Sequence, residues 1–546
     1  MRRPFLRVVL DPALVERLLP RGSFYRFLAE NIGKLATEDV VGGLFTDRKG
    51  RPSALPPEHY LALILLRYHD NVSYEVAAEK GQFDARWKAV LGKEPMNMTP
   101  TVSAASLHQF EDSLKRKGRH DVLLRRTLEM AREVGILARH VTAAQDSTSI
   151  TGRGAVKDTY NLLGDGVRRL IRALAKDQGM MPMAFAEQYG MGELFRRSTK
   201  ATANIDWSSP DARRGFLRRL VETAEALIGD ATRICAGRSD TAIDSAITIL
   251  QKVIEQDVQR ERDGSVSVRR GVAPDRLISI HDPEMRRGHK SQSEPFEGYK
   301  GHYTVDVRGG IVMATVVTGA NVHDAIPSAS MAADAERASG CVIIKLIGDG
   351  AYGTEANRVL HSAAGRVLVA KLPRARKADR YTKADFRIDL QNNTITCPTG
   401  KTTTRYTTIR KRREPGEDQA QVGTMRRFSF DSSECGACER RSQCITTSER
   451  QRRVDVGDNE HLFQAARKYA EDPQYVADRR ERQVAERTVA RFVQLGARQA
   501  RERGQNKVGA QITLIAVVAN LTRMLRIARD RTEPVTSTHS QMEASA

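Results

Sequence analysis

The chain has 546 residues and carries 88 Lys and Arg against 67 Asp and Glu, a formal net charge of +21. This balance favours a polyanionic partner, nucleic acid above all, because arginine-rich surfaces match phosphates and gain from counterion release; a protein that is merely basic is the alternative. The longest apolar run, 512–521, is about half the ~20 residues of a membrane span, and six cysteines do not make a disulfide scaffold in so long a chain. A membrane protein and a disulfide-rich secreted protein are therefore excluded, and the reducing cytoplasm is expected.

Residues 1–138 are predicted to be mostly helical. A helix with Pro in its first turn begins near 55–58 and has an apolar side from Tyr60 to Leu66. A short helix, a turn containing Gly81 and another helix follow over 73–91. This pattern is typical of a helix-turn-helix DNA reader and equally of an ordinary helical hairpin. We expect a helical domain for DNA binding or assembly.

Two short apolar segments each end in an aspartate, Asp146 and Asp349. Each predicts a buried strand that carries a carboxylate at its C-terminal end, where the active sites of open α/β sheets lie. Taken alone, either aspartate is equally typical of a helix cap or a turn. Together, in a strongly basic chain, they suggest metal-dependent chemistry on a polyanion, since phosphoryl transfer uses carboxylates to hold two cations.

The segments around these aspartates predict a mixed α/β core. Helices are expected over 155–265, strands at 277–280, 301–307 and 311–317, and a hairpin turn at 308–310. Strands and helices in this order describe an α/β core that contains a hairpin.

A third acid is expected from a helix near the C-terminal end. Tyr475, Arg479, Arg482 and Glu486 follow at steps of 4, 3 and 4, so they share one face of a helix whose opposite face is apolar. That helix can pack by its apolar stripe and offer Glu486 to a cleft. The alternative is a solvated Arg–Glu pair.

Four cysteines lie in a polar segment, as a single Cys397, a Cys-x-x-Cys pair and one more, Cys435, Cys438 and Cys444. Four thiolates suffice for a closed tetrahedral Zn²⁺ site, which would stabilise a segment too small for its own core. The spacing departs from two paired Cys-x-x-Cys motifs, and free cysteines are the alternative.

Several strings occur in an order that closely resembles bacterial insertion-sequence DDE transposases, over nearly the whole chain. These strings are, in chain order, Asp146-Ser-Thr, His281-Asp-Pro-Glu-Met-Arg-Arg-Gly-His-Lys290, Phe296-Glu-Gly-Tyr-Lys-Gly-His302, Gly319-Ala-Asn-Val-His-Asp324, Gly348-Asp-Gly-Ala-Tyr-Gly353 and Arg482-Gln-Val-Ala-Glu486. The helical start also looks like the N-terminal domain of that family. At the last motif this chain has Arg479 and Val493 where many relatives have Tyr and Lys.

The resemblance implies a ribonuclease H-like core with Asp146, Asp349 and Glu486 as an Mg²⁺-binding (or Mn²⁺-binding) triad. It also implies metal-dependent cleavage of double-stranded DNA at insertion-sequence ends, strand transfer into target DNA, self-association on DNA and a nucleoid-associated location. Lys290, Lys300, Arg479 and Arg482 are candidates to neutralise DNA phosphates, with solvated surface charge as the alternative. Two other functions remain open: a catalytically silent DNA-binding protein derived from a transposase, and a metal-dependent nuclease without strand transfer.

We expect this domain division, in chain order: a helical N-terminal domain, 1–138; the first part of the core with its helical insertion, 139–375; a Cys-rich, possibly zinc-binding insertion, 376–455; C-terminal helices that complete the core, 456–530; and a disordered tail, 531–546.

Overall fold

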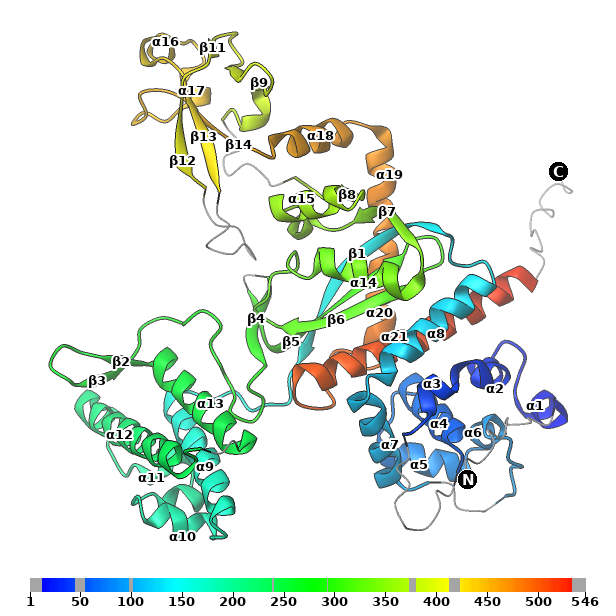
Figure 1. Ribbon diagram of the computed structural model, residues 1–546. Helices are drawn as coiled ribbons and strands as arrows, with labels where there is room; N and C mark the ends of the chain where they lie inside the picture. Colours follow the sequence, from blue (N-terminus) through cyan, green and yellow to red (C-terminus); the bar gives the residue numbers. More distant parts are fainter. Residues whose placement is uncertain are drawn as a thin grey trace, which may run out of the picture.

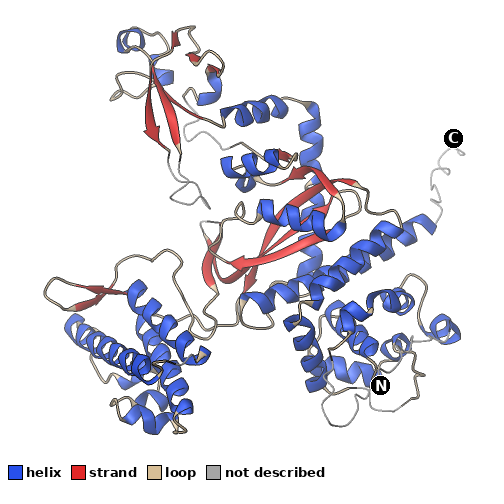
Figure 2. Cartoon of the chain, viewed as in Figure 1, coloured by secondary structure: helices blue, strands red, loops and turns tan. Residues whose placement is uncertain are grey.

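The computed structural model describes residues 12–44, 55–97, 102–237, 240–291, 293–372, 380–411 and 423–532. A central mixed sheet has helices on both faces, and three further groups of elements surround it (Figures 1 and 2). From residue 533 onward the expected tail lies outside the described residues, and its first two residues end a long helix.

The central sheet is built around one long strand, β1. Strand β5 pairs with it antiparallel on one side and β7 pairs with it parallel on the other, while β8 extends the β7 side and β4 and β6 pair with β5. The strands are β1 (His140–Thr151), β4 (Arg286–Ser291), β5 (Glu294–Asp306), β6 (Val312–Gly319), β7 (Val342–Ile347) and β8 (Val367–Val369). The α/β prediction and the predicted β5–β6 hairpin are confirmed.

Helices cover both faces of this sheet. Gln145 of β1 reaches α14 (Ser328–Ser339) by donating to the Ser328 carbonyl at 3.0 Å. The next residue, Asp146, points to the other face, because side chains alternate along a strand. There α20 (Gln483–Gln494) and α21 (Gln505–Thr532) pack on β1, β5 and β6.

The N-terminal region is helical as predicted. Its helices are α1 (Pro12–Leu18), α2 (Phe24–Leu35), α3 (Glu38–Val41), α4 (Pro57–His69), α5 (Tyr74–Phe83), α6 (Ala85–Val90), α7 (Ala104–Arg116) and α8 (Arg119–Glu133). The predicted turn at Gly81 is wrong: Gly81 lies inside α5. The chain turns at Asp84 instead, because its carboxylate accepts the Arg86 and Trp87 N–H groups and begins α6.

The helix α21 joins the N-terminal helices to the sheet. It packs on β6, α8, α4 and α2. By length and composition, Gln505–Arg531 is the one described helix able to cross a membrane, but 83% of its most apolar window is buried inside the protein. Its apolar character is therefore explained by its place in the core.

A helical group follows β1 and has its own apolar core. It contains α9 (Thr159–Asp177), α10 (Pro182–Glu187), α11 (Thr199–Thr202), α12 (Pro210–Ile234), α13 (Thr241–Asp257) and the hairpin β2 (Val258–Arg260) and β3 (Val266–Val268). The predicted strand at 277–280 is wrong. These residues form no strand, although Leu277, Ile278 and Ile280 are buried, because they pack as an irregular connector and the Leu277 N–H is bonded by the Gln256 side chain.

The polar segment after β8 contains strands that the sequence did not predict. Two three-stranded sheets and two short helices enclose a small core around Phe386, Phe428 and Val456. The elements are β9 (Arg387–Asp389), β10 (Thr394–Thr396), β11 (Thr402–Thr403), β12 (Tyr406–Arg410), β13 (Thr424–Ser429), β14 (Arg453–Gly457), α16 (Ser432–Gly436) and α17 (Arg441–Cys444). Helices α18 (Glu460–Ala470) and α19 (Pro473–Glu481) then return the chain to the sheet (Figure 1).

Asp306 ends β5 as a buried carboxylate, 2% exposed, that accepts the Gly309 N–H in the β5–β6 turn. Burial raises the pKa of Asp306 to about 6. Because this pKa lies above that of the unfolded chain, ionisation costs stability as the pH rises from about 4 to 6. We expect Asp306→Asn to stabilise the protein by up to about 2 kcal/mol at pH 7.5 and by nothing below pH 4, measured by denaturant unfolding at both pH values. Equal gains at both would contradict this account.

Candidate active site

Asp146 lies inside β1 rather than at its end. The strand continues to Thr151 because β5 pairs with it as far as Thr151↔Gly298, whereas the parallel partner β7 stops at Ala144↔Ile347. The prediction of a strand-end aspartate is therefore wrong for β1 as a whole. It holds only for the parallel pair, since Asp146 lies just past the last residue that β7 reaches.

Asp349 follows β7 after one residue, Gly348, and caps the short 3₁₀ turn Gly350–Tyr352. Its carboxylate accepts the Ala351 N–H at 2.8 Å, so the strand-end and cap interpretations both apply to it. The preceding Gly348 has no room for a side chain, because a Cβ there would lie 2.7 Å from Tyr352. The buried Tyr352 ring thus fixes the turn that presents Asp349.

Arg482 connects Asp146 to Glu486. Its guanidinium lies 3.1 Å from Asp146 Oδ2 and 2.5 Å from Glu486 Oε1. The expected single helical face is interrupted, because Arg482 is a one-residue break between α19 and α20. Tyr475 and Arg479 therefore belong to α19, where the Arg479 guanidinium lies 5.8 Å from the Tyr475 ring centre.

The Asp146 carboxylate is in an acidic and poorly hydrated environment. Burial raises its pKa to about 6, opposed by the Ser147 N–H and Arg482, and the negative charges of Asp349 and Asp324 raise it further. Asp146 and Asp349 each lie two positions past the last β1–β7 pair, Ala144↔Ile347, and Asp324 accepts the hydroxyl of the neighbouring Ser147. The ionised form of Asp146 is therefore under-compensated by this chain alone, and a bound cation would stabilise it.

Asp324 is a carboxylate of this site that our sequence analysis did not assign. It accepts the Ser147 hydroxyl at 3.0 Å and the Lys300 ammonium at 2.9 Å. Although burial opposes it, the Lys300 hydrogen bond holds the pKa of Asp324 below its usual value. Its place within one of the quoted strings was the available signal. Lys300 is thus occupied inside the site, with 16% of its side chain exposed.

Two buried tyrosines, Tyr303 and Tyr352, lie near these acids. Tyr303 lies opposite Asp146 in the β1–β5 register and donates to the Ala485 carbonyl at 3.4 Å, which ties α20 to the sheet. Burial raises the pKa of Tyr303 and of Tyr352 well above the usual value, and the charge of Asp146 raises both further. Both phenols are therefore neutral and support the site by packing.

Lys290 takes no part in this cluster of acids, and His302 borders it next to Asp324 and Lys300. Lys290 is exposed on β4 and faces Glu294 at 3.7 Å. His302 is buried, bonded to the Thr318 hydroxyl at 2.9 Å, and burial lowers its pKa to about 4, so it is a neutral structural residue.

The donor chemistry at Asp146, Asp349 and Glu486 fits Mg²⁺ or Mn²⁺, which prefer carboxylate oxygens. Within the described part of the chain, however, no three His, Cys, Asp or Glu side chains lie close enough together to hold a metal ion. Arg482 holds the position between Asp146 and Glu486 that a cation bound by both would need.

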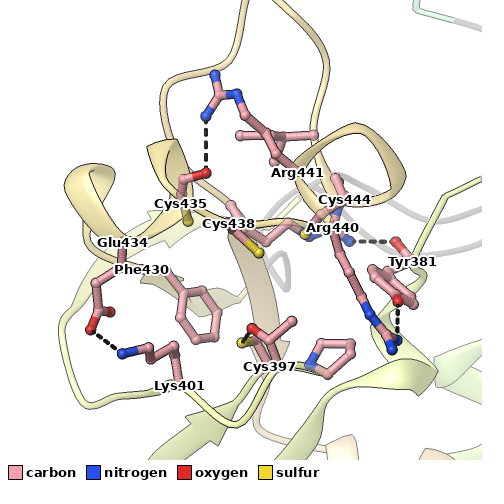
Figure 3. Close-up of a pocket in the computed structure, with 14 residues that line it drawn as sticks. Tyr381, Cys397, Lys401, Phe430, Glu434, Cys435, Cys438, Arg440, Arg441 and Cys444 are labelled. Carbon is pink, nitrogen blue, oxygen red and sulfur yellow. Dashed lines mark hydrogen bonds and ion pairs between the residues drawn. The ribbon is translucent and has the colours of Figure 1, made fainter.

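The four cysteines line one cavity (Figure 3). Cys435 and Cys438 come from α16 and the turn after it, Cys444 ends α17, and Cys397 follows β10. Burial raises the pKa of Cys444, Arg452 lowers it, and the other three thiols raise it. As the described residues lie, no three of these thiols form a group that could hold a metal ion.

Two family models match the chain. One describes a transposase domain and covers residues 14–113; the other describes a transposase DDE domain and covers residues 396–525, which include Glu486 and the four cysteines. No curated protein matches the sequence. The two matches, one at each end of the chain, support an insertion-sequence DDE transposase.

Proposed function

We propose that this protein cleaves DNA at the ends of its insertion sequence and joins the freed 3′ ends to target DNA. One observation carries the proposal: Asp146 and Asp349 each lie two positions past the last β1–β7 pair, Asp324 accepts the hydroxyl of the neighbouring Ser147, and Arg482 connects Asp146 to Glu486. Such a concentration of carboxylates in a chain of charge +21 suits phosphodiester chemistry at a metal centre.

In this proposal Asp146, Asp349 and Glu486 hold divalent cations, Mg²⁺ or Mn²⁺. The bound cations supply Lewis-acid stabilisation of the attacking and leaving oxygens. Arg482 must then release at least one carboxylate, after which its guanidinium remains at the rim of the site and pairs with a DNA phosphate. Asp324, held by Lys300, orients Ser147 beside Asp146.

This function is tested by joining assays with purified protein and Mg²⁺. The DNA substrates are duplexes that carry the inverted repeats flanking the gene of this protein. We expect strand-transfer products that end at the repeat boundary. Cleavage without joining would instead identify a nuclease, and binding without either reaction a silent transposase derivative. One radiolabelled end duplex and one plasmid target are enough to distinguish these three functions.

We further propose that the four cysteines bind a structural Zn²⁺. We expect about one zinc per chain by atomic emission, and its loss in Cys438→Ser, because three thiolates seldom close a tetrahedral site. Cys235→Ala is the matched control, since Cys235 is buried in the helical group. Wild-type zinc content in Cys438→Ser would rule out this site.

A further inference from the structure

A groove lined by arginines runs beside α20, away from the carboxylates. Two cavities share Val307, Arg308, Val484 and Arg487 and so form one continuous groove between the β5–β6 turn, the α19–α20 segment and α21. We call it the arginine groove; its arginines are Arg308, Arg480, Arg487, Arg491, Arg523 and Arg526. None of them was assigned to DNA by sequence.

The positive charge of the arginine groove is largely uncompensated. No ion pair joins any of its six arginines to a carboxylate in the part of the chain that the structure describes. Only two acids line the groove, Glu481 and Asp306, and the Asp306 carboxylate is engaged by the Gly309 N–H. Six guanidinium groups against two acids make a strongly positive concave surface, which attracts anions.

Two of the arginines are held in place by hydrogen bonds to neutral groups. Arg523 donates to the Gly309 carbonyl at 2.7 Å, and Arg491 donates to Thr522 and Gln494 at 3.3 and 3.2 Å. The Arg491 Nε is buried without a partner. Burial and the nearby charge of Arg526 lower the pKa of Arg491. These pre-positioned cations gain from an anion more than freely hydrated side chains would.

The groove and the catalytic acids lie on different sides of α20. At about 100° per residue, Arg487 and Arg491 are about 100–140° from Glu486 around the helix. The groove also reaches His140, Val141 and Thr142, four to six positions before Asp146 on β1, or roughly 13–20 Å along the strand. A DNA segment in the groove would therefore not occupy the carboxylate site.

We propose that the arginine groove binds the phosphate backbone of a duplex segment separate from the one that reacts. The proposal rests on the function proposed above and deepens it. Arg487 and Arg491 are one helical turn apart, about 5–6 Å between their Cβ atoms, and the charges continue onto α21. Such a row of charges suits a repeating phosphate chain better than a single small anion.

The test removes two charges that form no ion pair with a carboxylate in the described part of the chain. Arg487 and Arg526 are both exposed, so Arg487→Gln/Arg526→Gln should fold normally. Binding to a fluorescent 30-bp duplex is followed by anisotropy across salt concentrations. We expect the slope of log K against log[salt] to fall in magnitude by about 1.8, since each lost phosphate contact removes about 0.9.

The matched control, Arg125→Gln/Arg262→Gln, removes two exposed arginines on α8 and the β2–β3 hairpin. Its slope should stay at the wild-type value. An equal change in both variants, or none in the groove variant, overturns the proposal. Phenylglyoxal footprinting of the wild type gives a second reading: duplex DNA should slow modification at Arg487 and Arg526 and leave Arg262 unaffected.

The two sources of DNA are separated by order of addition. Protein preloaded with an unlabelled end duplex is titrated with a labelled unrelated duplex, and a second titration exchanges the two duplexes. The affinity of the groove variant is compared with that of protein with an intact groove. If the variant loses affinity only for the unrelated duplex, the groove binds target DNA; if it loses affinity only for the end duplex, the groove binds the element ends; either result supports the proposal. These order-of-addition measurements use Asp146→Asn protein and record binding without DNA cleavage or joining. Their outcome therefore does not depend on the catalytic proposal.

Discussion

Replacing Asp146 or Asp349 by asparagine is expected to lower DNA joining by more than about 100-fold. Loss of a residue that only supports a metal ligand already costs about 10–100-fold, and a ligand should cost more. The amide keeps the shape of the carboxylate but not its charge, which the proposed metal requires. The measurement is the rate of strand transfer at saturating DNA in Mg²⁺.

Asparagine preserves the hydrogen bonds that these aspartates accept from backbone N–H groups, but not the one that Asp146 accepts from Arg482. Asp146 accepts the Ser147 N–H and Asp349 the Ala351 N–H, both at 2.8 Å, and an amide oxygen accepts equally well. In Asp146→Asn, loss of the Arg482 ion pair and removal of a buried charge with a raised pKa act in opposite directions, so thermal unfolding should change little. Asp334→Asn is the control, because Asp334 is an exposed partner of Arg337 on α14. Wild-type joining by Asp146→Asn would remove the triad assignment.

The third acid is distinguished by a pair of variants on the same stretch of chain. Glu486 contacts Arg482 beside Asp146, whereas Glu481 lines the arginine groove. We expect Glu486→Gln to lose joining and Glu481→Gln to keep it. The opposite result would assign the third metal-binding acid to Glu481 and would contradict the proposed role of the Arg482–Glu486 contact.

The parts of the site that the sequence predicted are those encoded by local patterns. The apolar runs before Asp146 and Asp349 predicted their strands, and helical spacing predicted a helix carrying Glu486. Asp324 was missed because its role depends on Ser147, 177 positions away, which only the folded sheet brings to it. The break at Arg482 has no Pro or Gly to signal it.

The Cys-rich segment shows the same limit. Its strands are two to six residues long, too short for a clear alternation of apolar and polar residues. Their pairing, such as β13 with β14, joins residues about 28 positions apart, and three of the four cysteines lie between these two strands. Sequence composition therefore located the segment and its thiols, while the sheets that position them follow from tertiary contacts.

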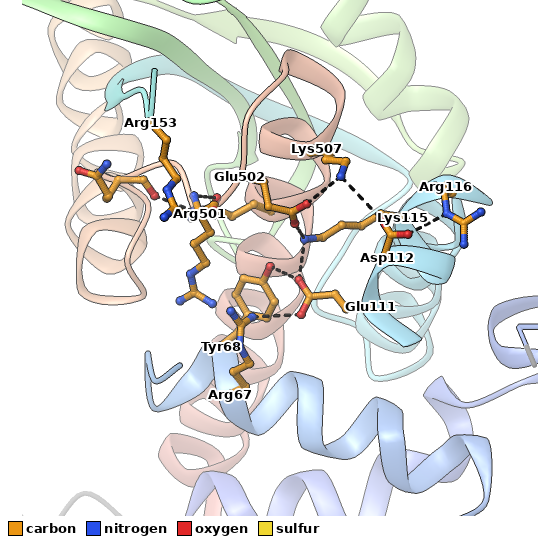
Figure 4. Close-up of polar contacts among 12 residues, drawn as sticks. Arg67, Tyr68, Glu111, Asp112, Lys115, Arg116, Arg153, Arg501, Glu502 and Lys507 are labelled. Carbon is orange, nitrogen blue, oxygen red and sulfur yellow. Dashed lines mark hydrogen bonds and ion pairs between the residues drawn. The ribbon is translucent and has the colours of Figure 1, made fainter. Parts of the chain in front are cut away.

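A buried charge network joins the N-terminal helices to the segment before α21 (Figure 4). Glu111 of α7 is 0% exposed and accepts Arg67 at 3.0 Å, Tyr68 at 2.8 Å and Lys115 at 2.6 Å. Lys115 also pairs with Glu502. The network thus holds α4 and α7 against the chain that leaves α20, the helix that carries Glu486.

Glu111→Ala is expected to lower the free energy of unfolding of the N-terminal helices by about 3–5 kcal/mol, because it leaves Arg67 and Lys115 buried without their carboxylate. Burial alone would raise the pKa of Glu111, but the charges of Lys115 and Arg67 lower it to about 2. This pKa lies below that of the unfolded chain, so the contribution is complete above about pH 4.5 and is lost as the pH falls toward 2. Denaturant unfolding at pH 7 and pH 3 measures both effects. Asp112→Asn, one residue along and solvent-accessible, should change stability by less than about 1 kcal/mol; equal losses in the two variants would mean that the network adds nothing beyond surface charge.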